Sequence, residues 1–241
     1  MFFQAFSQAD FFGKLIFVSL FILSCGCWFF LIHKIWIISE IRKNAKYFQK
    51  AVKKQKETLL DLDLHQLPRV KRSKLPHPFG HLYIELREKT IAVLDKNQFF
   101  ARTSQKEKYT NYLSLADMES IESHLHSAIT RQKNILDKNL FILSTTFKLA
   151  PFLGLLGTVW GILITFGELQ SGHGLASNRV ILGGLSTALT TTVLGLLIAI
   201  PALIGYNYLR DVSRRFSSEM VEFGHFLLST LEMQYRKADI V

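Results

Sequence analysis

The sequence is poor in cysteine and proline, and its long hydrophobic stretches contain no acidic residue. Two cysteines in 241 residues exclude a disulfide-rich scaffold and a four-cysteine zinc site. Five prolines and 14 glycines exclude a collagen-like chain and Pro/Gly-rich disorder. The mean hydropathy is nevertheless +0.19 with 20% charged residues. Charged and apolar residues must therefore occupy different segments.

Three stretches are long and apolar enough to cross a membrane. Residues 15–32 and 181–209 contain no charged residue, and 140–166 contain only Lys148. A spanning helix needs about 20 mostly apolar residues, and a lysine can extend toward the nearer interface. Together with their flanking aromatic residues, these stretches predict an all-α membrane protein with three transmembrane helices.

The distribution of lysine and arginine predicts the topology. The first ten residues contain neither, which differs from the positively charged start of a signal peptide. Segment 40–138 carries 20 Lys/Arg against 12 Asp/Glu, and such basic segments stay in the cytoplasm. The expected order is an external N-terminus at 1–10, a span at 11–38, a cytoplasmic helical domain at 39–139, a span at 140–166, an external loop at 167–179, a span at 180–209 and a cytoplasmic tail at 210–241.

Long helices are expected to extend the spans into the cytoplasm. Residues 39–60 contain helix formers without Pro or Gly and should continue the first span. A second helix is expected over roughly 80–108. Ser114 to Asp117 resembles a capping box, and the apolar spacing after it predicts a helix that runs straight into the second span. These amphipathic helices need partners, and copies of this chain are the simplest ones.

A basic cluster lies between these helices, at Arg69, Lys71, Arg72 and Lys74. It is either a solvated loop or a contact with anionic lipid head groups.

The second and third spans carry stripes of small residues, with Trp160 expected on the far side of the first stripe. Small residues let helix backbones approach closely in lipid. Threonine hydroxyls either bond their own helix or line a polar path through the membrane, and both readings stay open. The stripes are expected to require a homo-oligomer. The expected packing residues are Pro151, Gly154, Gly157, Gly161, Gly184, Gly195 and Pro201, and the candidate pore-lining residues are Thr158, Thr187, Thr191 and Thr192.

Signatures of catalysis or metal binding are missing from the sequence. His77 and His81 are four residues apart, but Pro78 between them argues against a helical ligand pair. No nucleophile or phosphate-binding motif occurs. We therefore expect no enzyme activity, no cofactor and no metal site.

Two strings make the resemblance to a known family specific. They are LAPFLGLLGTVWGILITF at 149–166 and GGLSTALTTTVLGLLIAIPALIGYNYL at 183–209. They resemble the paired-helix signature of the MotA/TolQ/ExbB proton channel family. The three spans favour the TolQ/ExbB branch, since MotA-type members normally have four, and a TolQ-like role is slightly preferred.

The resemblance implies a mechanism and partners. Family members form a homo-oligomeric ring, typically a pentamer, in the bacterial inner membrane, with the N-terminus in the periplasm and the C-terminus in the cytoplasm. A single-span TolR/ExbD-like partner with an intramembrane Asp takes and releases protons, which couples the proton motive force to envelope processes. Membrane lipids are further partners, and nucleic acid is not expected to be one.

One departure from the family pattern leaves two functions open. The family's third-span Glu falls at Thr187, a family threonine is kept at Thr192, and another is replaced by Leu149. If protons pass, the titrating group must come from the partner, with hydroxyls and water as the relay. The alternative is a non-conducting membrane scaffold of the same fold. A third function, a membrane-anchored nucleic-acid binder, is weakened by the acidic residues among the basic ones.

Overall fold

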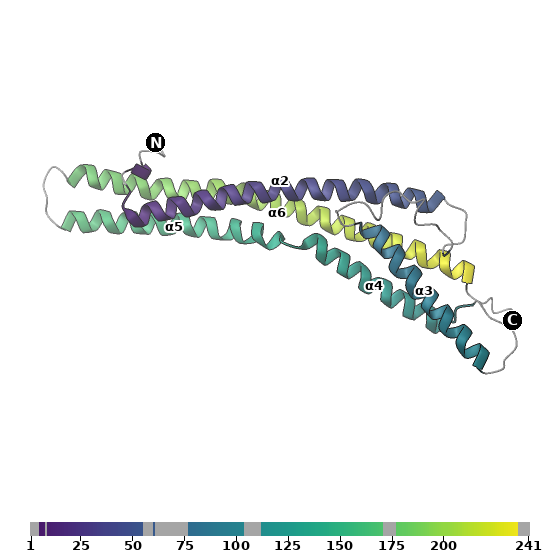
Figure 1. The fold of residues 1–241 in the computed structure, drawn as a ribbon. Helices are drawn as coiled ribbons and strands as arrows, with labels where there is room; N and C mark the ends of the chain where they lie inside the picture. The colour runs from purple at the N-terminus through teal and green to yellow at the C-terminus, as the bar shows by residue number, and fades with distance from the viewer. Residues whose placement is uncertain are drawn as a thin grey trace. The chain divides into compact units, whose positions relative to one another are not determined.

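The computed structural model describes residues 5–7, 9–54, 60, 77–103, 112–170 and 177–235, and its regular structure is helical (Figure 1). The described part contains no β-strand. The basic cluster at 69–74 and residues 171–176 of the expected external loop lie outside the described residues. The five long helices are α2 (Phe11–Lys54), α3 (Pro78–Thr103), α4 (Leu115–Asp137), α5 (Leu140–Gln170) and α6 (Ser177–Tyr235).

Three of these helices are long and apolar enough to cross a membrane. They are α2, α5 and α6, so the prediction of an all-α protein with three candidate spans is confirmed. Helix α2 continues without a break to Lys54, as the helix formers after residue 39 predict.

The chain divides into two compact units, and α2 and α6 contribute to both. We call Met1–Ile35 with Lys138–Asp211 the apolar unit, and Trp36–Asp137 with Val212–Val241 the polar unit. The apolar unit holds the beginnings of α2 and α6 together with α5. The polar unit holds the ends of α2 and α6 together with α3 and α4.

An aromatic core holds the polar unit together. The ring of Phe48 on α2 contacts those of Tyr83 on α3 and Phe223 on α6, with centroids 6.3 Å apart in each pair. Phe79 and Phe223 approach to 4.9 Å, and all four side chains are buried. The apolar positions Ile121, Leu125, Ile129 and Leu136 of α4 join the same core. These apolar positions of α4, for which the sequence pattern predicts partners, are therefore covered within the chain itself.

Side chains cap the starts of two helices in the polar unit. The Asp117 amide donates to Ser114 Oγ at 3.2 Å, and the Ser114 amide donates back to Asp117 Oδ2 at 3.0 Å, which confirms the capping box. At α3, the Gly80 amide donates to Nδ1 of buried His77 at 3.1 Å. Pro78 follows as the first helical residue, where its missing amide hydrogen costs nothing.

A turn separates α4 from α5 and contradicts the expectation of one continuous helix. Lys138 and Asn139 form this turn, and Asn139 has φ 69°. This left-handed conformation ends a helix, and asparagine tolerates it better than most residues other than glycine. Apolar spacing alone did not reveal the break, since the positions on both sides remain compatible with helix.

Helices α5 and α6 run side by side in the apolar unit through their glycines (Figure 1). A Cβ placed on Gly195 would lie 2.6 Å from the Ala150 carbonyl oxygen, and one on Gly154 would lie 2.9 Å from the Thr191 carbonyl oxygen. A Cβ on Gly161 would lie 2.8 Å from the Gly184 carbonyl oxygen. The two small-residue stripes therefore cover each other within one chain. The inference that they require other copies was wrong for that reason.

We predict that the His77 cap makes the protein less stable in mild acid. Burial, and secondarily the charge of His81, lowers the pKa of His77 below the usual 6.5. Below that pH the unfolded chain binds a proton more readily than the folded chain, so folding stability falls. His77→Asn keeps a capping acceptor but does not titrate. Between pH 7.5 and 5.5 its free energy of unfolding, and with it its melting temperature, should fall less than those of the wild type. The difference in free energy should be on the order of the ~0.5–2 kcal/mol of an N-cap. Equal drops would contradict this role.

We also predict that Gly195→Ala destabilises the α5–α6 contact. The added methyl would meet a backbone oxygen that cannot rotate away, and such overpacking costs roughly 1–3 kcal/mol. Gly167→Ala is the matched control, because a Cβ there meets nothing within 4 Å and alanine favours helix. Thermal unfolding in detergent should show a lower midpoint for Gly195→Ala only. The same midpoint for both variants would argue against close backbone packing.

Candidate functional site

The candidate site is a cavity of about 240 Å³ in the apolar unit. Helix α5 contributes Gly157, Trp160, Gly161 and Ile164 to its wall. Helix α6 contributes Gly184, Thr187 and Thr191, and the start of α2 adds Ala9, Asp10 and Gly13. The glycines leave open space beside the large indole of Trp160, so the same residues that bring the helices together also shape the cavity.

The structure places two of the four candidate threonines in this wall. Thr191 is fully buried and Thr187 is 6% exposed. Thr192 lies beside them and donates its hydroxyl hydrogen across the helix contact to the Gly154 carbonyl oxygen at 3.1 Å. Thr158 does not line the cavity and donates to the Leu155 carbonyl oxygen of its own helix at 2.7 Å.

Backbone carbonyl groups hold the hydroxyl hydrogens of the two threonines in the cavity wall. Thr187 donates to the Gly183 oxygen at 2.8 Å, and Thr191 donates to the Ala188 oxygen at 2.8 Å. A hydroxyl bonded in this way still offers its lone pairs as acceptors. It can receive a hydrogen bond from water or a protonated group, and it passes a proton on only when it rotates away from its carbonyl group.

The expected packing residues divide into two groups. Gly154, Gly157, Gly161, Gly184 and Gly195 lie at the α5–α6 contact, where an added Cβ would lie within 3.0 Å of atoms of the other helix. Pro151 and Pro201 lie inside α5 and α6 respectively. Each proline removes one backbone hydrogen bond from its helix.

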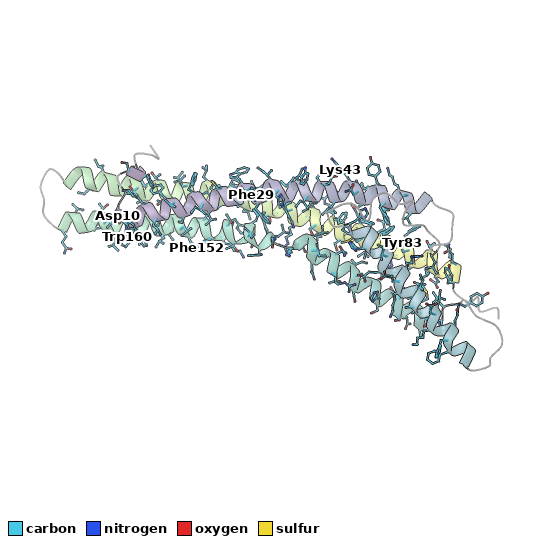
Figure 2. The ribbon with its side chains drawn as sticks, viewed as in Figure 1. Asp10, Phe29, Lys43, Tyr83, Phe152 and Trp160 are labelled. Carbon is cyan, nitrogen blue, oxygen red and sulfur yellow. The ribbon has the colours of Figure 1, made fainter. Side chains whose placement is uncertain are left out.

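Sequence reasoning missed the carboxylate of this site. Asp10 Oδ2 accepts a hydrogen bond from Trp160 Nε1 at 2.9 Å, and the ring of Trp160 lies 4.4 Å from that of Phe12 (Figure 2). Asp10 precedes the first apolar stretch, so a search for charges inside the spans does not find it. Trp160 does not lie on the far side of α5, since only ~60° separates it from Gly157 on the helix. Its indole therefore reaches the same cavity.

The described residues suggest no site for a metal ion. No group of three His, Cys, Asp or Glu side chains in that part of the chain is arranged to hold one. The polar groups of the cavity are one carboxylate, two hydroxyls and an indole N–H. This set suits the binding of water and protons.

Comparison with known proteins identifies the family of this chain. Residues 94–222 match the MotA/TolQ/ExbB proton channel family, a region that includes all of α5 and Thr187, Thr191 and Thr192 of α6. The chain is 35% identical over 139 residues to the biopolymer transport protein ExbB of Xanthomonas campestris pv. campestris strain B100, covering 56% of this chain and 53% of that protein.

Two further relatives carry different names. A putative biopolymer transport protein ExbB-like 2 of Helicobacter pylori strain 26695 is 36% identical over 148 residues, which cover 61% of this chain and 87% of the relative. The Tol-Pal system protein TolQ of Haemophilus influenzae is 33% identical over 114 residues, which cover 47% of this chain and 48% of the relative. The chain thus spans about half the length of the ExbB from Xanthomonas and of this TolQ.

The family match covers more than half of the chain, and both ExbB and TolQ occur among the relatives. The three apolar helices agree with a multi-pass protein of the inner membrane. The α5 and α6 walls of the cavity lie within the matched region, and the wall from α2 lies before it. This chain belongs to the MotA/TolQ/ExbB proton channel family.

Proposed function

We propose that this chain is a subunit of a TolQ/ExbB-type complex that couples proton movement across the bacterial inner membrane to work in the envelope. The observation that carries the proposal is the cavity between two spanning helices with Thr187 and Thr191 in its wall. Hydroxyl groups give such a cavity hydrogen-bonding capacity without the cost of a charge in lipid. Transport is also part of the names of the ExbB relatives.

The proposal includes a single-span partner of the TolR/ExbD type and a ring of copies of this chain, five as the family resemblance implies. The partner would bring an intramembrane Asp. The outer surfaces of the spans are apolar, with Leu155, Val159 and Leu163 of α5 all more than half exposed in the single chain. Such a surface suits contact with lipid or with a neighbouring copy.

A second candidate function is a non-conducting membrane scaffold. It is favoured by the hydrogen bonds of the threonines, because carbonyl oxygens accept from Thr158, Thr187, Thr191 and Thr192 alike. Hydroxyls satisfied in this way can serve packing alone. A flux measurement on the reconstituted complex separates the two functions.

We expect the Thr187→Val/Thr191→Val double variant to lose proton flux. Valine keeps the shape of threonine and removes the hydroxyl. A well-placed proton-transfer group contributes ~10²–10⁴-fold in rate, so flux should fall at least ~10-fold. The tagged chain is purified with its native partner and reconstituted in liposomes that contain a pH-sensitive dye. An imposed potential then drives protons inward.

Thr158→Val is the matched control, since that hydroxyl lies outside the cavity, and its flux should equal that of the wild type. Native mass spectrometry should show several copies of the chain in wild type and variants alike. Full flux in the double variant would rule out the threonine relay. Absence of flux in the wild-type complex would favour the scaffold.

The proposed topology places the α5–α6 connection in the periplasm and the polar unit in the cytoplasm. We predict this from the lysine and arginine bias. In a variant without Cys25 and Cys27, single cysteines replace exposed Gln170 and exposed Phe100. A membrane-impermeant maleimide applied to intact spheroplasts should label position 170 and should reach position 100 only after lysis. The opposite labelling would invert the topology.

A further inference from the structure

We propose that Asp10 is a proton-binding group of this chain, and that its carboxylate exchanges protons with water in the cavity it shares with Trp160 and Thr187. As a step in transport, this inference rests on the function proposed above. As a property of the site, it rests on the position of Asp10, on its neighbours and on the composition of the cavity wall.

Asp10 lies beside apolar parts of α5 and α6 that contain no acidic residue of their own. Helix α5 continues ten residues beyond Trp160 to Gln170, and α6 begins ten residues before Thr187 at Ser177. At 1.5 Å per residue, both residues lie ~15 Å from the ends of their helices. The apolar stretches of α5 and α6 likewise extend ~10 Å beyond them. Since Asp10 borders the same cavity, its carboxylate lies beside the apolar stretches of α5 and α6.

The start of α2 fixes the carboxylate in this place. Oδ1 accepts from the Gly13 amide at 3.0 Å and caps the helix, while Oδ2 accepts from Trp160 Nε1 at 2.9 Å. The first turn of α2 also lies against α6, since a Cβ on Gly13 would be 3.9 Å from Thr187 Cγ2. Figure 2 shows Asp10 and Trp160 near one another at the start of α2. Two helices thus orient one acid toward the cavity.

The described cavity wall contains no charge that would neutralise Asp10. The contributions of α5 and α6 are glycines, Ile164, Trp160 and the two threonines. On α2 the nearest basic residue is exposed Lys14, one turn further along.

An ionisable side chain at membrane depth is costly unless it faces water or binds a partner, and such residues mark proton or ion pathways. The cavity of about 240 Å³ has room for several waters at ~30 Å³ each, and Asp10, which is exposed, lines it. Protonation turns the carboxylate into a neutral acid, and release returns the proton to water. The threonine hydroxyls accept hydrogen bonds from such waters through their lone pairs.

The competing role is structural, with Asp10 serving only as a helix cap and an anchor for Trp160. Three variants separate the roles. Asp10→Asn keeps a capping oxygen but cannot titrate. Asp10→Glu keeps the carboxylate. Trp160→Phe removes the indole donor and leaves the carboxylate in place. A structural role makes Asp10→Asn and Trp160→Phe behave alike, whereas proton binding makes them differ.

The first test is labelling with dicyclohexylcarbodiimide, which enters lipid and reacts with protonated carboxyl groups. The purified full chain in lipid nanodiscs is treated at several pH values between 5.5 and 8.5, and mass spectrometry locates the adduct. We expect labelling of Asp10 that falls as the pH rises, because only the protonated carboxyl group reacts. Trp160→Phe should keep this dependence, and Asp211, outside the apolar stretch of α6, serves as the internal control. Absent or pH-independent labelling at Asp10 overturns the inference, whether or not the complex conducts.

The second test is proton flux in the liposome assay described above. We expect Asp10→Asn to lower flux ~10-fold or more, comparable to the loss of a positioned proton-transfer group. Asp10→Glu should retain much of the flux. Wild-type flux in Asp10→Asn overturns the inference and leaves the proposed function standing. If the wild type conducts no protons but Asp10 is labelled as expected, the proposed function fails and the proton-binding site stands.

Discussion

The close approach of the α5 and α6 backbones is the constraint on which the apolar unit depends. Glycine at positions 154, 161 and 195 lets carbonyl oxygens of one helix lie where a side chain of the other would begin. In lipid no hydrophobic driving force brings helices together, so contact of this kind supplies much of the attraction. The cavity and the hydroxyl groups in its wall follow from the same spacing, because glycine leaves room that larger residues would fill.

This packing gives the threonines a role in the contact between the two helices. In a helix pair without close contact, Thr192 would bond within its own helix. Here it donates to Gly154 on α5, so it joins the two helices as well as offering an acceptor. Packing and proton transfer are therefore not exclusive roles for these residues. The carbonyl groups that satisfy the hydroxyls also hold them oriented beside the cavity.

The sequence alone allowed much of the fold to be predicted, since its signals are local. Apolar length identified the three candidate spans, and Ser114 with Asp117 identified the start of α4. Two features could not be predicted from the sequence. The turn at Asn139 depends on one backbone conformation that leaves the apolar pattern unchanged. The pairing of Asp10 with Trp160 joins residues 150 positions apart. The position of Asp10 before the first apolar stretch does not indicate that its side chain contacts α5.

The indole of Trp160 also allows the site to be followed by intrinsic fluorescence. Tryptophan emission responds to charge beside the ring, and the Asp10 carboxylate lies in hydrogen-bond contact with this one. The other two tryptophans, Trp28 and Trp36, are 52% and 62% exposed. Phenylalanine can therefore replace them without disturbing the packing of buried side chains. A chain with Trp160 as its single tryptophan would thus carry an intrinsic fluorophore at the cavity, with no attached dye, whose emission reports on the surroundings of the Asp10 carboxylate.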